Sequence, residues 1–173
     1  VRPRLGVAFP YEGALHDVDR QLLADGITTG FHGVTLSWEG GLRGAPYAQR
    51  MVDGLACMHA ELGAHHYVHL RFETHNIDDV ALAQEWIRGG LVRFMAFNDH
   101  LPSMVKRLGD DRKLLQYAER AECDLDTFQA RIRQAMQASD KVAGATRELA
   151  ATARGAGLRI ASHDDPDCVT RRY

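Results

Sequence analysis

The chain has 173 residues, a length that fits one domain with a substantial core. Its composition, 45% hydrophobic and 25% charged, is typical of a globular protein and excludes a disordered, collagen-like or disulfide-scaffold chain. A net charge of −2 offers no basic excess for nucleic acid, and no apolar run approaches the ~20 residues that a membrane span needs. We therefore expect neither a nucleic-acid nor a membrane partner.

The three cysteines, Cys57, Cys123 and Cys168, are odd in number and lack the spacing of a metal finger. This pattern indicates reduced thiols, and the opening residues show no cleavable signal pattern. We expect a cytoplasmic location.

Apolar spacing alternates between helical and extended patterns along the chain. The first part of the chain is predicted to form a helix around 15–22, a strand at 27–34, a glycine-rich loop at 38–46, a helix at 51–62 and a strand at 66–72. A helix capped by Asn76 and ended by Gly89 follows, and then a strand at 91–97. The rest is predicted to form a charged and partly helical excursion at 102–123, a helix from 125 capped by Asp124 or Asp126, helical spacing at 142–155 and a strand at 158–162. Strands that alternate with helices favour a parallel sheet, either doubly wound or part of a (β/α)8 TIM-type barrel.

The second predicted strand has one apolar and one polar face. Val68, Leu70 and Phe72 share one face, so His69, Arg71 and Glu73 share the other. A parallel sheet covered by helices is apolar on both faces, whereas the mouth of a barrel is a polar cavity. This pattern favours the barrel, with His69 and Arg71 as substrate-binding residues; Arg71 either binds a phosphate or neutralises Glu73.

The four predicted strands each finish on a histidine or a carboxylate, at His32, Glu73, Asn98-Asp99-His100 and His163-Asp164-Asp165. Imidazole and carboxylate groups on strand ends are common ligands of Zn²⁺, Mn²⁺ and Fe²⁺. We expect Glu73, His100 and His163 to hold a divalent metal, zinc in the first place, that lowers the pKa of a bound water. His32 alone fits a structural role, His65 and His66 are expected in solvent, and His75 fits a loop or the site.

The segments His69-Leu70-Arg71-Phe72-Glu73, Asn98-Asp99-His100 and Ala161-Ser162-His163-Asp164-Asp165 resemble the amidohydrolase superfamily. Within it they resemble the phosphonate-metabolism branch, the triphosphate diphosphatases of the carbon–phosphorus lyase pathway. Pro3, Asp17, 26–29 and 37–39 are also similar to this branch. The resemblance implies a barrel with one or two metals, in which Glu73 replaces the usual carboxylated lysine and His100 and His163 are ligands. It also gives Asp164 and Asp165 a catalytic role in cleaving a ribosyl phosphonate 5-triphosphate to the 5-phosphate and diphosphate.

Two elements of the family pattern are not found in this sequence: the His-x-His or His-x-Asp pair of the first strand and the aspartate of the last strand. We expect residues 1–173 to be the central portion of one barrel domain, inactive alone, with edge strands that could support a homo-oligomer. Two other functions stay open. One is hydrolysis of a C–N bond in a cyclic amide or amino-heterocycle, and the other is a catalytically silent fragment or binding module.

Overall fold

The computed structural model describes residues 10–164. Its centre is one parallel sheet in which the order of the strands in space follows their order in the chain. The strands are β1 (Thr29–Leu36), β2 (His65–Glu73), β3 (Val92–Asn98) and β4 (Arg159–Ser162). The predicted α/β class and parallel sheet are confirmed, and the parallel direction places all four carboxyl ends at one edge.

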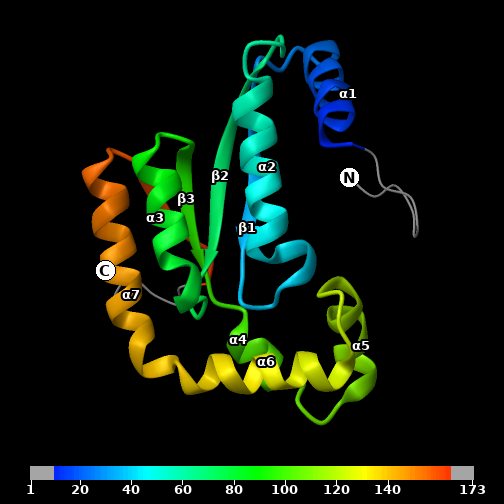
Figure 1. Ribbon diagram of the computed structural model, residues 1–173, viewed down its shortest axis with the longest axis vertical. Coiled ribbons are helices and arrows are strands. Elements are labelled where there is room, and N and C mark those ends of the chain that lie inside the picture. The colour runs from blue at the N-terminus through cyan, green and yellow to red at the C-terminus, as the bar shows by residue number, and fades with distance from the viewer. Residues whose placement is uncertain (1–9, 165–173) are drawn as a thin grey trace.

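Helices cover one face of this sheet (Figure 1). This layer contains α2 (Ala45–Met58), α3 (Val80–Arg88) and α7 (Ser139–Gly155), and α1 (Tyr11–Ala24) packs beside α2. The predicted excursion at 102–123 is helical and forms α4 (Leu101–Val105) and α5 (Asp111–Arg120), and α6 (Leu125–Gln137) packs against both. These three helices, referred to below as the excursion, lie beyond the carboxyl ends of the strands. Two short 3-10 helices, η1 (Gly41–Arg43) and η2 (Ile77–Asp79), follow β1 and β2.

The core consists of two separate hydrophobic clusters. The larger one lies between the sheet and its helices and contains Leu70, Phe72 and Trp86, each no more than 2% exposed. The smaller one lies within the excursion, where Phe128 and Ile132 of α6 are fully buried. The excursion therefore has its own core and covers the carboxyl edge as a packed unit.

Element ends differ from the predictions where side chains have other partners. Asn76 does not cap α3 with its side chain, because its amide donates to Asp79 (2.8 Å) and η2 precedes the helix. Asp124, one of two predicted caps, accepts from the backbone N–H of Thr127 (2.7 Å) at the start of α6.

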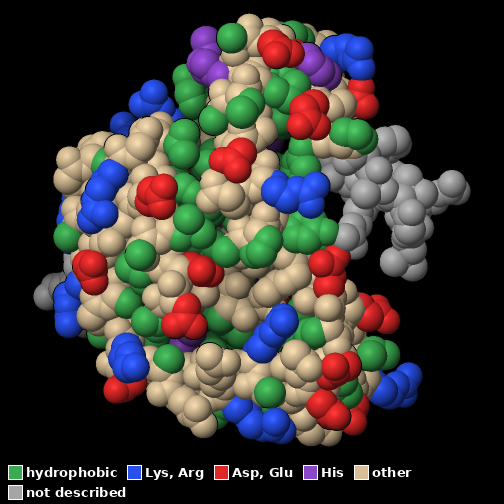
Figure 2. Space-filling view, viewed as in Figure 1, with side chains coloured by type: hydrophobic (Ala, Val, Ile, Leu, Met, Phe, Trp, Pro, Cys, Tyr) green, Lys and Arg blue, Asp and Glu red, His purple; other side chains and the backbone are tan. Residues whose placement is uncertain are grey.

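Charged side chains of both signs are interspersed over the helical face, with no large area of one sign (Figure 2). Among residues 10–164, no helix is long and apolar enough to cross a membrane.

A buried carboxylate fastens α1 to the amino-terminal edge of the sheet. Asp19 accepts hydrogen bonds from the backbone N–H groups of Gly63 (3.1 Å) and Ala64 (2.8 Å) and from Nε2 of His66 (3.0 Å). The prediction that His66 lies in solvent is wrong: it belongs to β2, is 5% exposed, and its Nδ1 lies 2.7 Å from Nε2 of His32. These hydrogen bonds, that of Ala64 foremost, lower the pKa of Asp19 to about 2.

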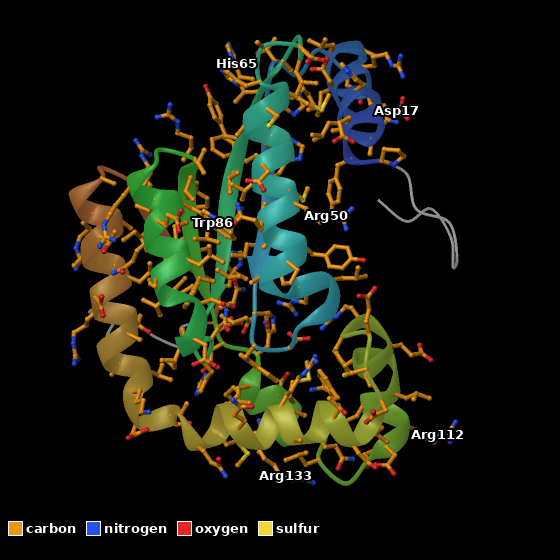
Figure 3. All side chains as sticks on the ribbon, in the orientation of Figure 1. Asp17, Arg50, His65, Trp86, Arg112 and Arg133 are labelled. Carbon is orange, nitrogen blue, oxygen red and sulfur yellow. The ribbon has the colours of Figure 1, made fainter. Side chains whose placement is uncertain are left out.

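A carboxylate with a lowered pKa stabilises the fold above its unfolded pKa and loses that effect as the pH falls through its folded pKa. Asp19→Asn should therefore lower the urea midpoint at neutral pH, and its difference from the parent should shrink between about pH 4 and about pH 2. Asp17→Asn is the matched control, because Asp17 is on the same helix, exposed and paired with Arg20 (Figure 3). Equal losses for both variants at neutral pH would contradict the role of Asp19.

Candidate functional site

Polar side chains gather where the strands end at the carboxyl edge. Glu73 is the last residue of β2 and pairs in register with Asn98, the last residue of β3. His100 follows two residues later, and His163 comes directly after β4. In α/β proteins with parallel sheets, ligands and chemistry are found at this edge.

Glu73 is 1% exposed and both of its oxygens accept hydrogen bonds. Oε1 accepts from Nη2 of Arg43 (2.8 Å) and lies 2.5 Å from Nδ1 of His100, while Oε2 accepts from the backbone N–H of His100 (3.1 Å). Arg43 is therefore the cation that neutralises Glu73. Of the two roles predicted for Arg71, phosphate binding or neutralisation of Glu73, the second is wrong. Because three donors converge on it, Glu73 fixes the orientation of the His100 ring.

A second buried carboxylate connects this site to the excursion. Glu39 is also 1% exposed, and it accepts from Nη1 of Arg43 (2.6 Å) and from Arg120 of α5. Its backbone carbonyl accepts from Nη1 of Arg131 in α6 (2.5 Å). Charged groups thus run without interruption from α5 through Glu39 and Arg43 to Glu73.

The pKa of His100 is raised, foremost by its hydrogen bond to Glu73 and further by the charges of Glu73 and Asp164. Burial and the charge of Arg43 act in the opposite direction. His100 can therefore hold a proton near neutral pH, and Nε2 is the ring nitrogen that faces away from the bond with Glu73.

The predicted substrate-binding residues lie on the face of the sheet opposite the helices. The His69 ring is stacked with that of His163, with 6.3 Å between ring centroids. Burial, followed by the charges of Arg71 and His163, lowers the pKa of His69. Nε2 of His69 and Nε of Arg71 are both buried with no hydrogen-bond partner among residues 10–164. The hydrogen-bonding capacity of these two nitrogens is therefore unused within the described residues.

The predicted catalytic aspartates are described only in part. Asp164 is exposed and its Oδ2 accepts from the backbone N–H of Asp99 (2.7 Å), which ties the end of β4 to the end of β3. The Asp99 carboxylate pairs with Nδ1 of His75 (3.2 Å), so His75 belongs to this edge. Asp165 lies outside the described residues.

The donor types at the edge fit a divalent ion, since neutral imidazole and carboxylate oxygen are ligands of zinc, manganese and iron. Besides Nε2 of His69, Oδ1 of the buried Asn98 has no partner among the described residues. Within residues 10–164, however, no three His, Cys, Asp or Glu side chains come close enough together to hold one ion. Glu73 and His100 contact each other directly, whereas His163 contacts His69, so the metal role of Glu73, His100 and His163 stays a prediction.

Two site residues, Glu39 and Arg43, were not found by sequence reasoning, which treated 38–46 as a loop and cited Glu39 only within the resemblance at 37–39. Arg43 reaches a carboxylate 30 positions away, and Glu39 reaches one cation 81 positions away. The only local signal is the pair of opposite charges at a spacing of four residues in a glycine-rich segment.

Comparisons of the sequence with protein-family models and curated proteins, and of the structure with solved structures, found no match. The assignment of a function therefore depends on the residues and the geometry of this chain.

The raised pKa of His100 leads to a prediction about Glu73→Gln. The His100–Glu73 pair stabilises the fold below the unfolded histidine pKa, and this effect is lost as the pH rises through the raised folded value. Without the carboxylate, the midpoint of His100 titration should fall, as followed by NMR of the imidazole Cε1–H. Glu148→Gln removes the same charge from the exposed side of α7 and should leave this midpoint unchanged. An unchanged midpoint in Glu73→Gln would show that the hydrogen bond does not control the protonation of His100.

Proposed function

We propose that this chain forms part of a metal-dependent hydrolase of the amidohydrolase superfamily that cleaves a ribosyl phosphonate 5-triphosphate to the 5-phosphate and diphosphate. The observation that carries the proposal is the contact of Glu73 and His100 at the carboxyl edge of the parallel sheet, together with Nε2 of His69, which has no hydrogen-bond partner among the described residues. These are the residues on which the sequence resemblance depends.

The arrangement of the sheet supports a (β/α)8 barrel over a doubly wound sheet. A doubly wound sheet carries helices on both faces and reverses its strand order, whereas the strands of a barrel follow one another and keep all helices outside. Here α2, α3 and α7 lie on one face, and the strand order is sequential. The opposite face carries His69 and Arg71, as the lumen near the mouth of a barrel would.

The proposed metal ligands are Glu73, His100 and His163, with zinc as the ion and manganese or iron as alternatives. A divalent ion supplies Lewis acidity, which makes water nucleophilic near neutral pH and neutralises phosphoryl charge. For His100 to become a ligand, the proton favoured by Glu73 must leave Nε2, since only neutral imidazole binds a metal. Glu73 then orients the ring through Nδ1, as carboxylates commonly do for histidine ligands.

The other predicted site residues bind the substrate and take up the proton. The guanidinium of Arg71 and the imidazole of His69 bind phosphate oxygens, for which their unpartnered nitrogens are available. The oxygen of water forms a bond to phosphorus as the bond to the diphosphate oxygen breaks. Asp164 and Asp165 are proposed to accept the proton that the water loses.

The activity test uses a protein in which this chain is part of a complete barrel with the first-strand and last-strand segments of the family pattern. Diphosphate release is measured with and without added divalent metal. We expect Glu73→Gln to lower turnover by roughly three orders of magnitude or more, the equivalent of ~4 kcal/mol in the barrier. Glu148→Gln should retain full turnover, because Glu148 is exposed and, among the described residues, its carboxylate accepts a hydrogen bond from Gln84 alone.

Robust diphosphate release by Glu73→Gln after chelation would overturn the metal mechanism. If the protein hydrolyses a cyclic amide or amino-heterocycle and releases no diphosphate, its function is cleavage of a C–N bond and the proposed phosphonate substrate is wrong.

A further inference from the structure

A cavity of about 810 Å³ lies beside the site, between the loop after β1, the η2 segment and the helices α6 and α7. Its lining contains two groups of residues, referred to below as its two ends, which are held by different contacts: Arg131 donates to the carbonyl of Glu39 in the loop, and His75 lies 3.4 Å from the hydroxyl of Ser139 at the start of α7. One end is lined by the glycine-rich loop, the start of α2 and Arg131, and the other by His75, Asp78, Asp79 and Lys141. The proposed hydrolytic site uses none of the groups at the first end for binding substrate.

The first end is rich in hydrogen-bond donors. Gly40 has φ +79°, and a Cβ at this position would lie 2.4 Å from Nη1 of Arg131, so glycine lets the guanidinium lie directly on the loop. Arg131 forms no ion pair with any described residue, because Glu39 offers it only a backbone carbonyl and pairs its carboxylate with Arg43 and Arg120. A cation without a carboxylate partner, at the wall of a cavity, is suited to an anionic ligand.

Two further donors line the same end of the cavity. The indole Nε1 of Trp38 is buried with no hydrogen-bond partner among the described residues. The 14-residue helix α2 begins there at Ala45. Its N-cap, Gly44, has no side chain to cap the first N–H groups, and Pro46 in the first turn contributes no N–H. An uncapped helix start favours an anion through both its N–H groups and its dipole. Glu122 also lines this end, where it accepts from the hydroxyl of Tyr47 (3.3 Å), so this end carries one carboxylate as well as the guanidinium of Arg131.

The second end offers acceptors. Asp78 is exposed, and Asp79 accepts from the side-chain amide of Asn76 (2.8 Å). Carboxylates repel a phosphate and accept hydrogen bonds from hydroxyl groups. Lys141 lies on this side without an ion pair among the described residues.

From the cavity, from Arg131 without an ion pair among the described residues at one end and from the two carboxylates Asp78 and Asp79 at the other, we infer that this chain binds a small phosphate ester of a polyhydroxylated compound, with the phosphate on Arg131 and Trp38 and the hydroxyls toward Asp78. The volume suits a ligand of this size, because small-molecule sites commonly occupy ~300–1,000 Å³. The inference is independent of the hydrolysis proposed for the carboxyl edge.

The two tryptophans of the chain make the test local. Inorganic phosphate, ribose and ribose 5-phosphate are each titrated in buffer freed of divalent metal, and the indole N–H signals are followed by NMR. We expect phosphate and ribose 5-phosphate to shift the Trp38 signal in a saturable way. The Trp86 signal should stay unchanged, since its Nε1 donates to Gln49 (2.9 Å) between α3 and α2.

Substitutions separate the two ends of the cavity. Arg131→Gln should weaken binding of both phosphate compounds tenfold or more, whereas Arg133→Gln, from the outward side of the same helix, should not (Figure 3). Asp78→Asn should leave inorganic phosphate unaffected and reduce the advantage of ribose 5-phosphate over it. An unchanged Trp86 signal verifies that each variant is folded, and Arg131→Lys provides a conservative replacement if Arg131→Gln does not fold.

The inference is overturned if no saturable shift of Trp38 occurs, if both indole signals move together, or if Arg131→Gln and Arg133→Gln weaken binding equally. Equal weakening would show that net charge, and not the cavity, attracts the anion. Because metal is absent, this result does not depend on the diphosphate assay, and the failure of either proposal leaves the other standing.

Discussion

Two carboxylates buried to 1% exposure, Glu39 and Glu73, share the guanidinium of Arg43, and the carboxyl edge is organised around this arrangement. A charge removed from water costs several kcal/mol unless it is paired and hydrogen-bonded. Arg43 alone cannot satisfy two carboxylates, so Arg120 supplies a cation on one side and His100 supplies donors on the other. The position of His100 and the docking of the excursion are therefore coupled through one chain of charges.

This coupling explains why a segment with its own core belongs to the same site as the sheet. The excursion buries Phe128 and Ile132 without contributing to the larger cluster. Its attachment to the strand ends combines the polar contacts of Arg120 and Arg131 with Glu39 and the packing of Trp38 on Phe128. Movement of the excursion would leave Glu39 buried with only part of its charge compensated, which opposes such movement. The same attachment shapes the cavity, one wall of which is α6.

The two edges of the sheet use histidine in different ways. At the amino edge, Asp19 and His66 hold α1 in place, and burial followed by the charge of His66 lowers the pKa of His32. At the carboxyl edge, His100 has a raised pKa, and the neighbouring polar face holds His69 with a lowered one. Two imidazoles with opposite tendencies close to one site can divide the roles of proton donor and neutral ligand. A composition with nine histidines does not distinguish these uses.

The sequence by itself determined the α/β class, the parallel sheet and the edge at which Glu73, Asn98, His100 and His163 meet, because periodicity and strand ends are local properties. It also separated the faces of β2, where Val68, Leu70 and Phe72 are buried as their alternation predicts. Only the tertiary structure decided which charge meets which: Arg43 pairs with Glu73, Glu39 with Arg120, and Asp19 with His66. These partners lie 30, 81 and 47 positions apart, and pairing over such separations depends on how helices and loops pack and not on any local pattern.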